Sequence, residues 1–414
     1  MKFYFPDSQD LISPTYDFIH DEYSPLRVRQ RDDLYAHEVL TQTPYDGILV
    51  SKAIVDGSVA GSGKYSTAQR ERLYRLGVKE FFRLPEGVES LGDCGAFNYV
   101  NETRPPYTVE EVLDYYEVCG FDAGVSVDHV ILGYDRTFGL DNAPKDWLER
   151  RQITLEYAER FLEVGRDRGS KVQPVGAAQG WSPASYADSV RSLQEMGYDR
   201  IALGGMVPLK TPDILACLTA INDVRKPDTS LHLLGVTRVS SMVEFADLGV
   251  ASFDSTSPFR QAFMDDRNNY HTSDATYVAI RVPQVDGNPA LKRAILGGVV
   301  SQKEAVKAER ECLRSLRAFD IGDATIEEVL SSLGNYAEVA QSLRRSYLDD
   351  YRRTLEAAPW KSCSCSICKA CSIEVAIFRG TERNKRRGFH NVAVFGQSVR
   401  NLKTTVGKAR KKRG

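Results

Sequence analysis

One pattern restricts the possible fold more than any other. Between about residue 90 and residue 260, short apolar segments alternate with helical segments, and each apolar segment ends in a polar residue or a glycine. This alternation is typical of a parallel sheet, because parallel neighbours are joined by helical crossovers. So many units in series favour a closed (β/α)8 barrel, the TIM barrel, over an open sheet.

The pattern also gives the approximate extent of each element. Expected strands cover residues 47–51, 90–92, 123–127, 172–177, 201–203, 231–234 and 250–253. Expected helices cover residues 108–118, 151–168, 183–196, 212–224 and 241–248. Residues 302–356 differ, since Ala, Glu, Leu and Arg recur there at helical spacing without strands between them.

Polar and glycine residues gather where the expected strands end, and TIM barrels carry their active sites at these ends. The residues in question are Asp93, Asp128, Gln179, Gly204, Gly205 and Asp254. In Ser252-Phe253-Asp254-Ser255 an apolar run stops abruptly at a carboxylate that a substrate could reach. A helix cap is the alternative explanation, because Asp and Ser are preferred in caps. Capping does not explain why the other polar residues fall at the same strand ends.

Length and charge limit the class of protein. The 414 residues with 42% hydrophobic content fit one large barrel with additions, or two domains. The formal net charge of -2 indicates no general affinity for polyanions. Only basic charges follow Glu382, however, which favours contact of this end with phosphates. A solvated, partly disordered tail is the alternative for residues 408–413.

No secretory signal follows Met1, and no apolar run is long enough to cross a bilayer. We therefore expect a cytoplasmic protein without membrane contact. In that compartment the eight cysteines are better explained by metal binding or burial than by disulfides.

The spacing Cys363-x-Cys365-x-x-Cys368 is typical of a structural Zn²⁺ site, and His390 or Cys371 could complete it. Four protein ligands leave no position for water, so the metal is expected to be structural. The alternative is a set of buried, unliganded cysteines.

The expected divisions of the chain are an N-terminal entry segment (1–45), a barrel core (46–300), a helical insertion (301–358), a zinc-binding subdomain with a closing helix (359–402) and a basic tail (403–414).

Five motifs in order, followed by the zinc pattern with His390, resemble the tRNA-guanine transglycosylase superfamily. The motifs are Asp93-Cys94-Gly95-Ala96-Phe97, Val127-Asp128, Gln179-Gly180, Leu203-Gly204-Gly205-Met206 and Phe253-Asp254 with Pro258-x-Arg260. Each is weak alone, but their shared order is specific. The resemblance covers roughly residues 91–402, interrupted by the helical insertion.

The resemblance implies a base exchange in nucleic acid, in which a 7-deazaguanine replaces guanine without a break in the backbone. It assigns Asp254 as the nucleophile of a covalent glycosyl intermediate and Asp93 as the general acid and base. His390, not Cys371, becomes the fourth zinc ligand. It assigns base binding, by hydrogen bonds and by stacking of the flipped-out base, to Asp128, Gln179, Gly204, Gly205, Met206, Phe97 and Leu234.

Departures from the family pattern resemble its DNA-modifying DpdA branch. They include Cys94-Gly95-Ala96 in place of Ser-Gly-Gly, Ser255 in place of Cys, and the helical insertion. This branch implies DNA as the polymer, 7-cyano-7-deazaguanine as the incoming base and helper proteins of a restriction-modification system, and the wider family implies a homodimer.

Three alternatives remain open from the residues alone. The same chemistry could act on tRNA, because the basic tail and the helical insertion would meet phosphates in either polymer. A non-catalytic binding paralogue is disfavoured, because both Asp93 and Asp254 are present. A hydrolase that removes the base and stops would require water at the intermediate.

Overall fold

The computed structural model describes residues 1–7, 9–57, 63–340 and 347–411, with side chains up to residue 402. Contacts divide the chain into two compact units. The barrel unit comprises Met1–Gln9, Tyr45–Thr256 and Val399–Gly414, and the second unit comprises Asp10–Pro44 and Ser257–Ser398.

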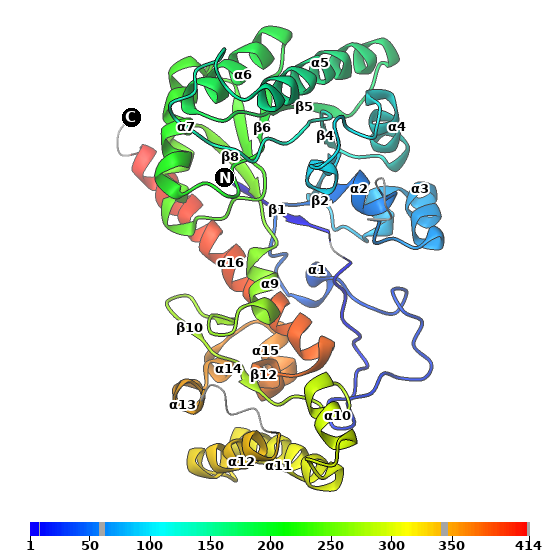
Figure 1. Cartoon of the computed structure of the whole chain (residues 1–414), viewed down its shortest axis with the longest axis vertical. Coiled ribbons are helices and arrows are strands. Elements are labelled where there is room, and N and C mark those ends of the chain that lie inside the picture. The colour runs from blue at the N-terminus through cyan, green and yellow to red at the C-terminus, as the bar shows by residue number, and fades with distance from the viewer. Residues whose placement is uncertain (8, 58–62, 341–346, 412–414) are drawn as a thin grey trace. The chain divides into compact units, whose positions relative to one another are not determined.

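The barrel unit contains the predicted TIM barrel: eight parallel strands, paired in chain order, close into a ring with helices outside it (Figure 1). The strands are β1 (Lys2–Pro6), β2 (Gly47–Ser51), β3 (Glu89–Asp93), β4 (Ala123–Val125), β5 (Gln173–Ala178), β6 (Arg200–Leu203), β7 (Ser230–Leu233) and β8 (Val250–Asp254). The sequence predicts an N-terminal entry segment over residues 1–45, whereas residues 2–6 form the first barrel strand. This strand closes the ring by pairing with β8, with Tyr4 opposite Asp254.

Several of the outer helices begin or end at recognisable capping residues. They are α2 (Lys52–Val55), α3 (Thr67–Phe81), α4 (Val109–Cys119), α5 (Lys145–Arg168), α6 (Pro183–Met196), α7 (Thr211–Val224) and α8 (Met242–Asp247). Thr108 caps α4 in a reciprocal pair with Glu111, which satisfies two otherwise unpaired amides. Left-handed Gly120 and Gly169 end α4 and α5. These local signals explain why the helical pattern could be read from the sequence.

Two strand glycines bring a helix close to the sheet beneath the candidate site. A Cβ on Gly92 or Gly124 would lie 2.3 Å from the Tyr116 ring, so only glycine leaves room for that ring. The Tyr116 hydroxyl also donates a 2.9 Å hydrogen bond to the carbonyl oxygen of Val125. Helix α4 is thereby fixed against β3 and β4.

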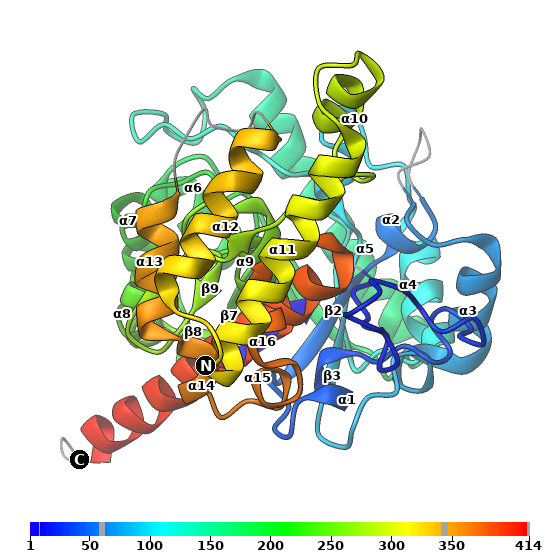
Figure 2. The same cartoon turned by 90° about the horizontal axis from the view of Figure 1, so that it is seen from below.

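The second unit is mainly helical. Its helices are α1 (Ala36–Val39), α9 (Ser257–Met264), α10 (Pro289–Leu296), α11 (Gln302–Ile321), α12 (Ile326–Val339), α13 (Leu348–Ala357), α14 (Pro359–Ser362), α15 (Ser366–Cys371) and the first part of α16 (Gly380–Lys411). Two small sheets pair β9 (Tyr270–His271) with β10 (Thr276–Tyr277) and β11 (Ile280–Arg281) with β12 (Ile377–Phe378). Figure 2 shows α11, α12 and α13 side by side, where the sequence predicts a helical insertion.

A buried ion network ties the segment 10–44 to α16 within the second unit. Asp21 accepts hydrogen bonds from Arg379 and Arg383. Arg383 also donates to Glu374 at 2.6 Å, and Arg379 donates to Glu309 at 2.6 Å. Pairing of this kind offsets the large cost of burying a guanidinium. The irregular N-terminal segment is therefore held by charge pairs that a hydrophobicity pattern does not reveal.

The backbone of α16 continues to Lys411, so residues 403–411 of the predicted basic tail are helical, while residues 412–414 lie outside the described part of the chain. The side chains of residues 403–414 lie outside the described part of the chain. Within that part, none of the helices combines the length and the apolar character needed to cross a membrane.

Candidate active site and metal centre

The strand-end residues predicted from the sequence do lie at one end of the barrel, because all eight strands are parallel. Asp93 is the last residue of β3 and Asp254 the last of β8. The others follow directly on the intervening strands: Asp128 after β4, Gln179 after β5, Gly204, Gly205 and Met206 after β6, and Leu234 after β7. The barrel therefore brings residues from six strands to one end.

At this end of the barrel, the charges of two carboxylates act on a third, that of Asp93. A carboxylate oxygen of Asp93, the sulfur of Cys94 and a carboxylate oxygen of Asp128 all lie within 4.8 Å of one another. Burial, together with the charges of Asp128 and Asp254, raises the pKa of Asp93 to about 8. Burial also raises the pKa of Asp128. At neutral pH Asp93 therefore holds a proton, which suits it to donate one to a leaving group.

Asp128 is held in place by hydrogen bonds to both carboxylate oxygens. The Cys94 thiol donates to Oδ1 at 3.0 Å, and the Gln179 amide donates to Oδ2 at 2.6 Å. The Tyr99 hydroxyl lies 3.0 Å from both the Cys94 sulfur and the Asp128 carbonyl oxygen. Burial and the neighbouring carboxylates raise the pKa of Cys94 well above its usual value, so it remains a thiol donor. Hydrogen bonding therefore accounts for the close approach of Cys94 and Asp128.

Gly204 and Gly205 are required by close packing around Gln179. A Cβ on Gly204 would lie 2.1 Å from Nε2 of Gln179. Gly205 has φ +74°, and a Cβ there would lie 2.4 Å from the Ile131 carbonyl oxygen. The Ile131 amide donates to Oε1 of Gln179 at 3.1 Å. Both ends of the Gln179 amide are thus fixed, and its orientation is set.

The two carboxylate oxygens of Asp254 differ in their hydrogen bonds. Oδ1 accepts a 2.9 Å hydrogen bond from the Gly235 amide and lies 3.2 Å from Nε2 of His232. The other ring nitrogen of His232, Nδ1, lies 2.8 Å from Oγ of Ser252. Within the described residues, Oδ2 has no hydrogen bond or ion pair, so this oxygen is available to react.

Sequence reasoning missed His232 and Tyr99. His232 is a fully buried polar residue between Leu231 and Leu233, and this break in an apolar strand was the available signal. Its relation to Asp254 depends on the β7–β8 register, which places His232 opposite Ser252. Tyr99 reaches the site through the short 3-10 helix Ala96–Tyr99, which no sequence pattern announced.

The apolar residues expected around the base differ in exposure. Met206 is fully buried, whereas Leu234 is partly buried and packs on the barrel core. Phe97 lies in the same 3-10 helix as Tyr99 and is 51% exposed, so its ring face is accessible to a ligand. Stacking of a base on Phe97 and Leu234 stays a prediction.

The second unit brings the predicted metal ligands together. The sulfurs of Cys363, Cys365 and Cys368 lie 3.6, 3.4 and 3.3 Å from Nδ1 of His390. Tetrahedral Zn²⁺ with ordinary Zn–S and Zn–N bonds places such atoms about 3.6 Å apart. Nε2 of His390 lies 2.7 Å from the His271 carbonyl oxygen, which orients the ring so that Nδ1 faces the sulfurs.

Cys371 does not belong to this group. It is buried at the end of α15, and the four clustered ligand atoms come from Cys363, Cys365, Cys368 and His390. The Tyr270 ring stacks on the His390 ring at 4.3 Å, and its hydroxyl lies 3.2 Å from the Cys368 sulfur. The three cysteines and the histidine can hold a metal ion, and a set of four soft and borderline ligands fits Zn²⁺.

Comparison with known proteins agrees with this geometry. The family model described as "Queuine tRNA-ribosyltransferase" matches residues 97–294. The chain is 47% identical over 405 residues to the DNA-guanine transglycosylase of Salmonella montevideo, and the match covers 95% of each chain. It is 29% identical over 154 residues to the queuine tRNA-ribosyltransferase of Marinobacter nauticus, covering 37% of this chain and 40% of that protein.

A queuine tRNA-ribosyltransferase from another bacterium also matches. Identity to the queuine tRNA-ribosyltransferase of Saccharophagus degradans is 30% over 132 residues, or 31% of this chain and 34% of that protein. The similarity to the tRNA enzymes is thus confined to part of the chain, while the similarity to the Salmonella protein runs through almost all of it. The chain therefore belongs to the guanine transglycosylase family, in the branch that includes the DNA-guanine transglycosylase.

Proposed function

We propose that this enzyme exchanges guanine in DNA for a 7-deazaguanine, with 7-cyano-7-deazaguanine as the incoming base. Two carboxylates with different surroundings carry the proposal for the chemistry. Oδ2 of Asp254 has no hydrogen bond among the described residues, and a pKa of about 8 keeps a proton on Asp93 at neutral pH. The end-to-end similarity to a protein named DNA-guanine transglycosylase supports DNA as the polymer.

In the first half-reaction, Oδ2 of Asp254 attacks C1′ of the target deoxyguanosine. The bond from C1′ to the guanine nitrogen breaks, and Asp93 donates its proton to the departing base. The products are a glycosyl ester on Asp254, an ionised Asp93 and free guanine. Because the DNA backbone takes no part, the strand stays intact.

In the second half-reaction, the 7-deazaguanine takes the place of guanine. Asp93, now a carboxylate, removes the proton from the five-membered-ring nitrogen of the incoming base. That nitrogen attacks C1′, the ester bond breaks, and both aspartates return to their starting states. One residue thus acts first as acid and then as base.

Base recognition is assigned to the groups around Asp128 and Gln179. Asp128 accepts from N–H groups on the edge of the base, and Gln179 with the Gly205 amide reads its carbonyl oxygen. Phe97 and Leu234 stack on the two faces of the ring. Support comes from the fixed geometry of these groups, since rigid donors and acceptors select a base without reorganisation.

The direct test supplies labelled 7-deazaguanine with either duplex DNA or tRNA, with and without cell extract as a source of helper proteins. We expect label in DNA; label in tRNA alone would overturn the DNA assignment. Asp254→Asn should abolish incorporation and the adduct retained on denaturing gels. The matched control is Asp141→Asn, an exposed carboxylate of the same unit, which should exchange normally.

We further propose that Cys363, Cys365, Cys368 and His390 hold one structural Zn²⁺, which supplies no open coordination position. Support comes from the four ligand atoms clustered within 4.8 Å. His390→Ala should reduce the metal content measured by elemental analysis to near zero and lower the melting temperature. Cys371→Ala, the nearby cysteine outside the cluster, should retain one equivalent.

A homodimer and helper proteins of a DNA-modification system belong to the same proposal, supported by membership in the family. Light scattering of the purified enzyme measures its oligomeric state and so tests the homodimer. Restoration of base exchange by added cell extract tests the requirement for helper proteins.

A further inference from the structure

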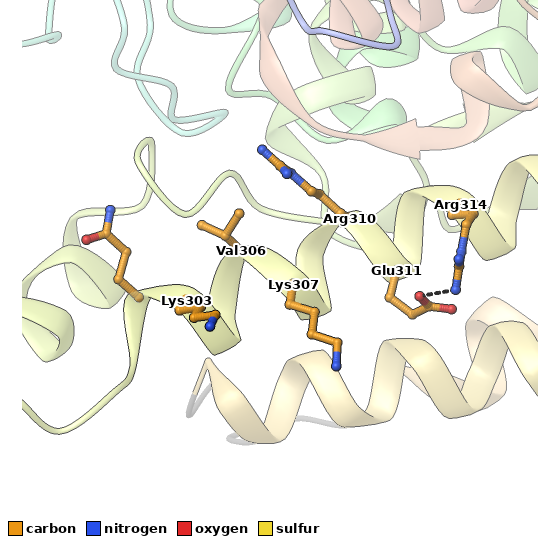
Figure 3. A pocket seen from close by; sticks show the side chains of 7 residues that line it. Lys303, Val306, Lys307, Arg310, Glu311 and Arg314 are labelled. Atoms are coloured by element: carbon orange, nitrogen blue, oxygen red, sulfur yellow. Dashed lines mark hydrogen bonds and ion pairs between the residues drawn. The ribbon is translucent and has the colours of Figure 1, made fainter.

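A stripe of positive charge runs along α11 in the second unit. The basic stripe is defined by Lys303, Lys307, Arg310 and Arg314, which line a hollow of about 860 Å³ (Figure 3). At about 100° of rotation per residue, these positions fall within a sector of about 60° on the helix. All four side chains are exposed.

Packing of the opposite helix face fixes the direction of the stripe. The Cys312 sulfur lies 3.1 Å from the Ser332 carbonyl oxygen, and Oγ of Ser315 lies 2.7 Å from Oγ of Ser332. Because these buried contacts hold the helix, the stripe cannot turn away from solvent.

The charge of the stripe is mostly unbalanced. Arg314 pairs with Glu311, the single acidic residue that lines the hollow. Lys303, Lys307 and Arg310 have no ion pair or hydrogen bond to another side chain in the part of the chain that the structure describes. Glu309 of the same helix is buried and accepts from Arg379. Glu304 is exposed on the same helix and Glu311 pairs with Arg314, yet three of the four cations of the stripe have no acidic partner among the described residues.

We propose that the basic stripe binds the sugar-phosphate backbone of the DNA substrate. The identity of the polymer rests on the proposed function. The stripe is about 16 Å long at 1.5 Å per residue, and one DNA strand presents about five phosphates over that length. Contacts of this kind add affinity and hold the duplex in register, but they carry no sequence information.

The test compares two triple variants that lose the same charge. The stripe variant changes Lys303, Lys307 and Arg310 to Gln. The control variant changes three exposed lysines of the barrel unit to Gln: Lys79, Lys171 and Lys226. Binding of a labelled duplex is measured by fluorescence anisotropy from low to high salt, without a 7-deazaguanine base.

For the stripe variant, the slope of log K against log salt should fall by about 2.7, which corresponds to three lost phosphate contacts. The control should keep the wild-type slope. Equal changes in the two variants, or a loss of tRNA binding without a loss of DNA binding, would overturn the proposal. The assay requires no base exchange, so failure of the proposed chemistry would show separately as binding without incorporation.

A separate observation in the barrel unit carries a second inference. His232 is fully buried, with Nδ1 beside the Ser252 hydroxyl and Nε2 beside Oδ1 of Asp254. If the hydroxyl donates to Nδ1, the ring proton lies on Nε2 and is donated to Asp254. We infer that His232 is a positioning residue, which with the Gly235 amide holds Oδ1 and thereby presents Oδ2 to the sugar.

This inference rests on the proposed role of Asp254, and two variants test it. His232→Leu should slow formation of the covalent adduct at least tenfold, with unchanged DNA affinity and a folded protein by thermal melting. His232→Gln, whose amide can still donate, should restore most of the rate. Equal rates in the Leu and Gln variants, or a folded Leu variant at wild-type rate, would overturn it. Failure of the nucleophile assignment would appear separately, as full exchange by Asp254→Asn.

Discussion

Replacing Asp128 by Asn should move the pH dependence of guanine release. Asp93 must be protonated to act as an acid, so the wild-type rate should fall as pH rises through about 8. One oxygen of Asp128 lies within 4.8 Å of Asp93. With an effective dielectric constant of about 20, the repulsion between two charges at that distance is about 3.5 kcal/mol, or about 2.5 pKa units.

The variant removes this repulsion but preserves the surrounding contacts. An Asn side chain can accept from the Gln179 amide with its oxygen and donate to the Cys94 sulfur with its nitrogen. Burial and the charge of Asp254 still act on Asp93. The pH at which the rate of guanine release falls should therefore move down by about two units. The fall itself should remain, because Asp93 must still be protonated.

Single-turnover release of guanine from labelled DNA, measured at saturating enzyme from pH 5 to pH 10, gives the pH at which the rate falls. Weaker base binding in Asp128→Asn lowers the height of the profile, whereas the midpoint reports the pKa of Asp93. Cys94→Ser is the control, since it keeps the Asp128 charge and a hydroxyl donor, and its midpoint should stay near the wild-type value. An unmoved midpoint in Asp128→Asn would refute the assignment of Asp93 as the acid.

Two further substitutions test the packing. Gly205→Ala forces a Cβ to within 2.4 Å of a carbonyl oxygen at positive φ, and such strain costs at least about 1–2 kcal/mol; kcat/KM should fall tenfold or more. Its control is Gly334→Ala in α12, where a Cβ meets open space and the melting temperature should rise. Arg383→Met leaves Asp21 and Glu374 short of a buried partner and should lower the free energy of unfolding by about 3–5 kcal/mol in urea titrations; a loss below 1 kcal/mol would show that the network is dispensable.

Much of the barrel could be predicted because its signals are local. Helix α4 has a capping box at its start and a left-handed glycine at its end, and β5 to β8 are apolar runs that stop at polar or small residues. β1 gave no such signal, because Lys2-Phe3-Tyr4-Phe5 is short and precedes a proline, and no helix follows it closely. Its place in the ring depends on pairing with β8, far along the chain.

The residues of the site likewise divide into those that a local pattern predicts and those whose place depends on the fold. Strand-end positions identified Asp93, Asp128 and Asp254, because parallel topology brings strand ends together. Hydrogen bonds that depend on register or on an irregular turn, such as those of His232 and Tyr99, could not be inferred from spacing. Spacing also predicted the three clustered cysteines but left the fourth member of the cluster open, since the choice between His390 and Cys371 depends on how α16 lies against α15.

The pairing of β1 with β8 has a consequence for how the chain folds. These strands are separated by about 240 residues, yet their hydrogen bonds close the ring. Until β8 has been synthesised and has docked, β1 and β7 each expose an unpaired strand edge, and such edges promote association between chains. Closing so long a loop is also slow. The strand that carries Asp254 should therefore be among the last to become ordered, and the reactive carboxylate should acquire its surroundings only when the ring closes.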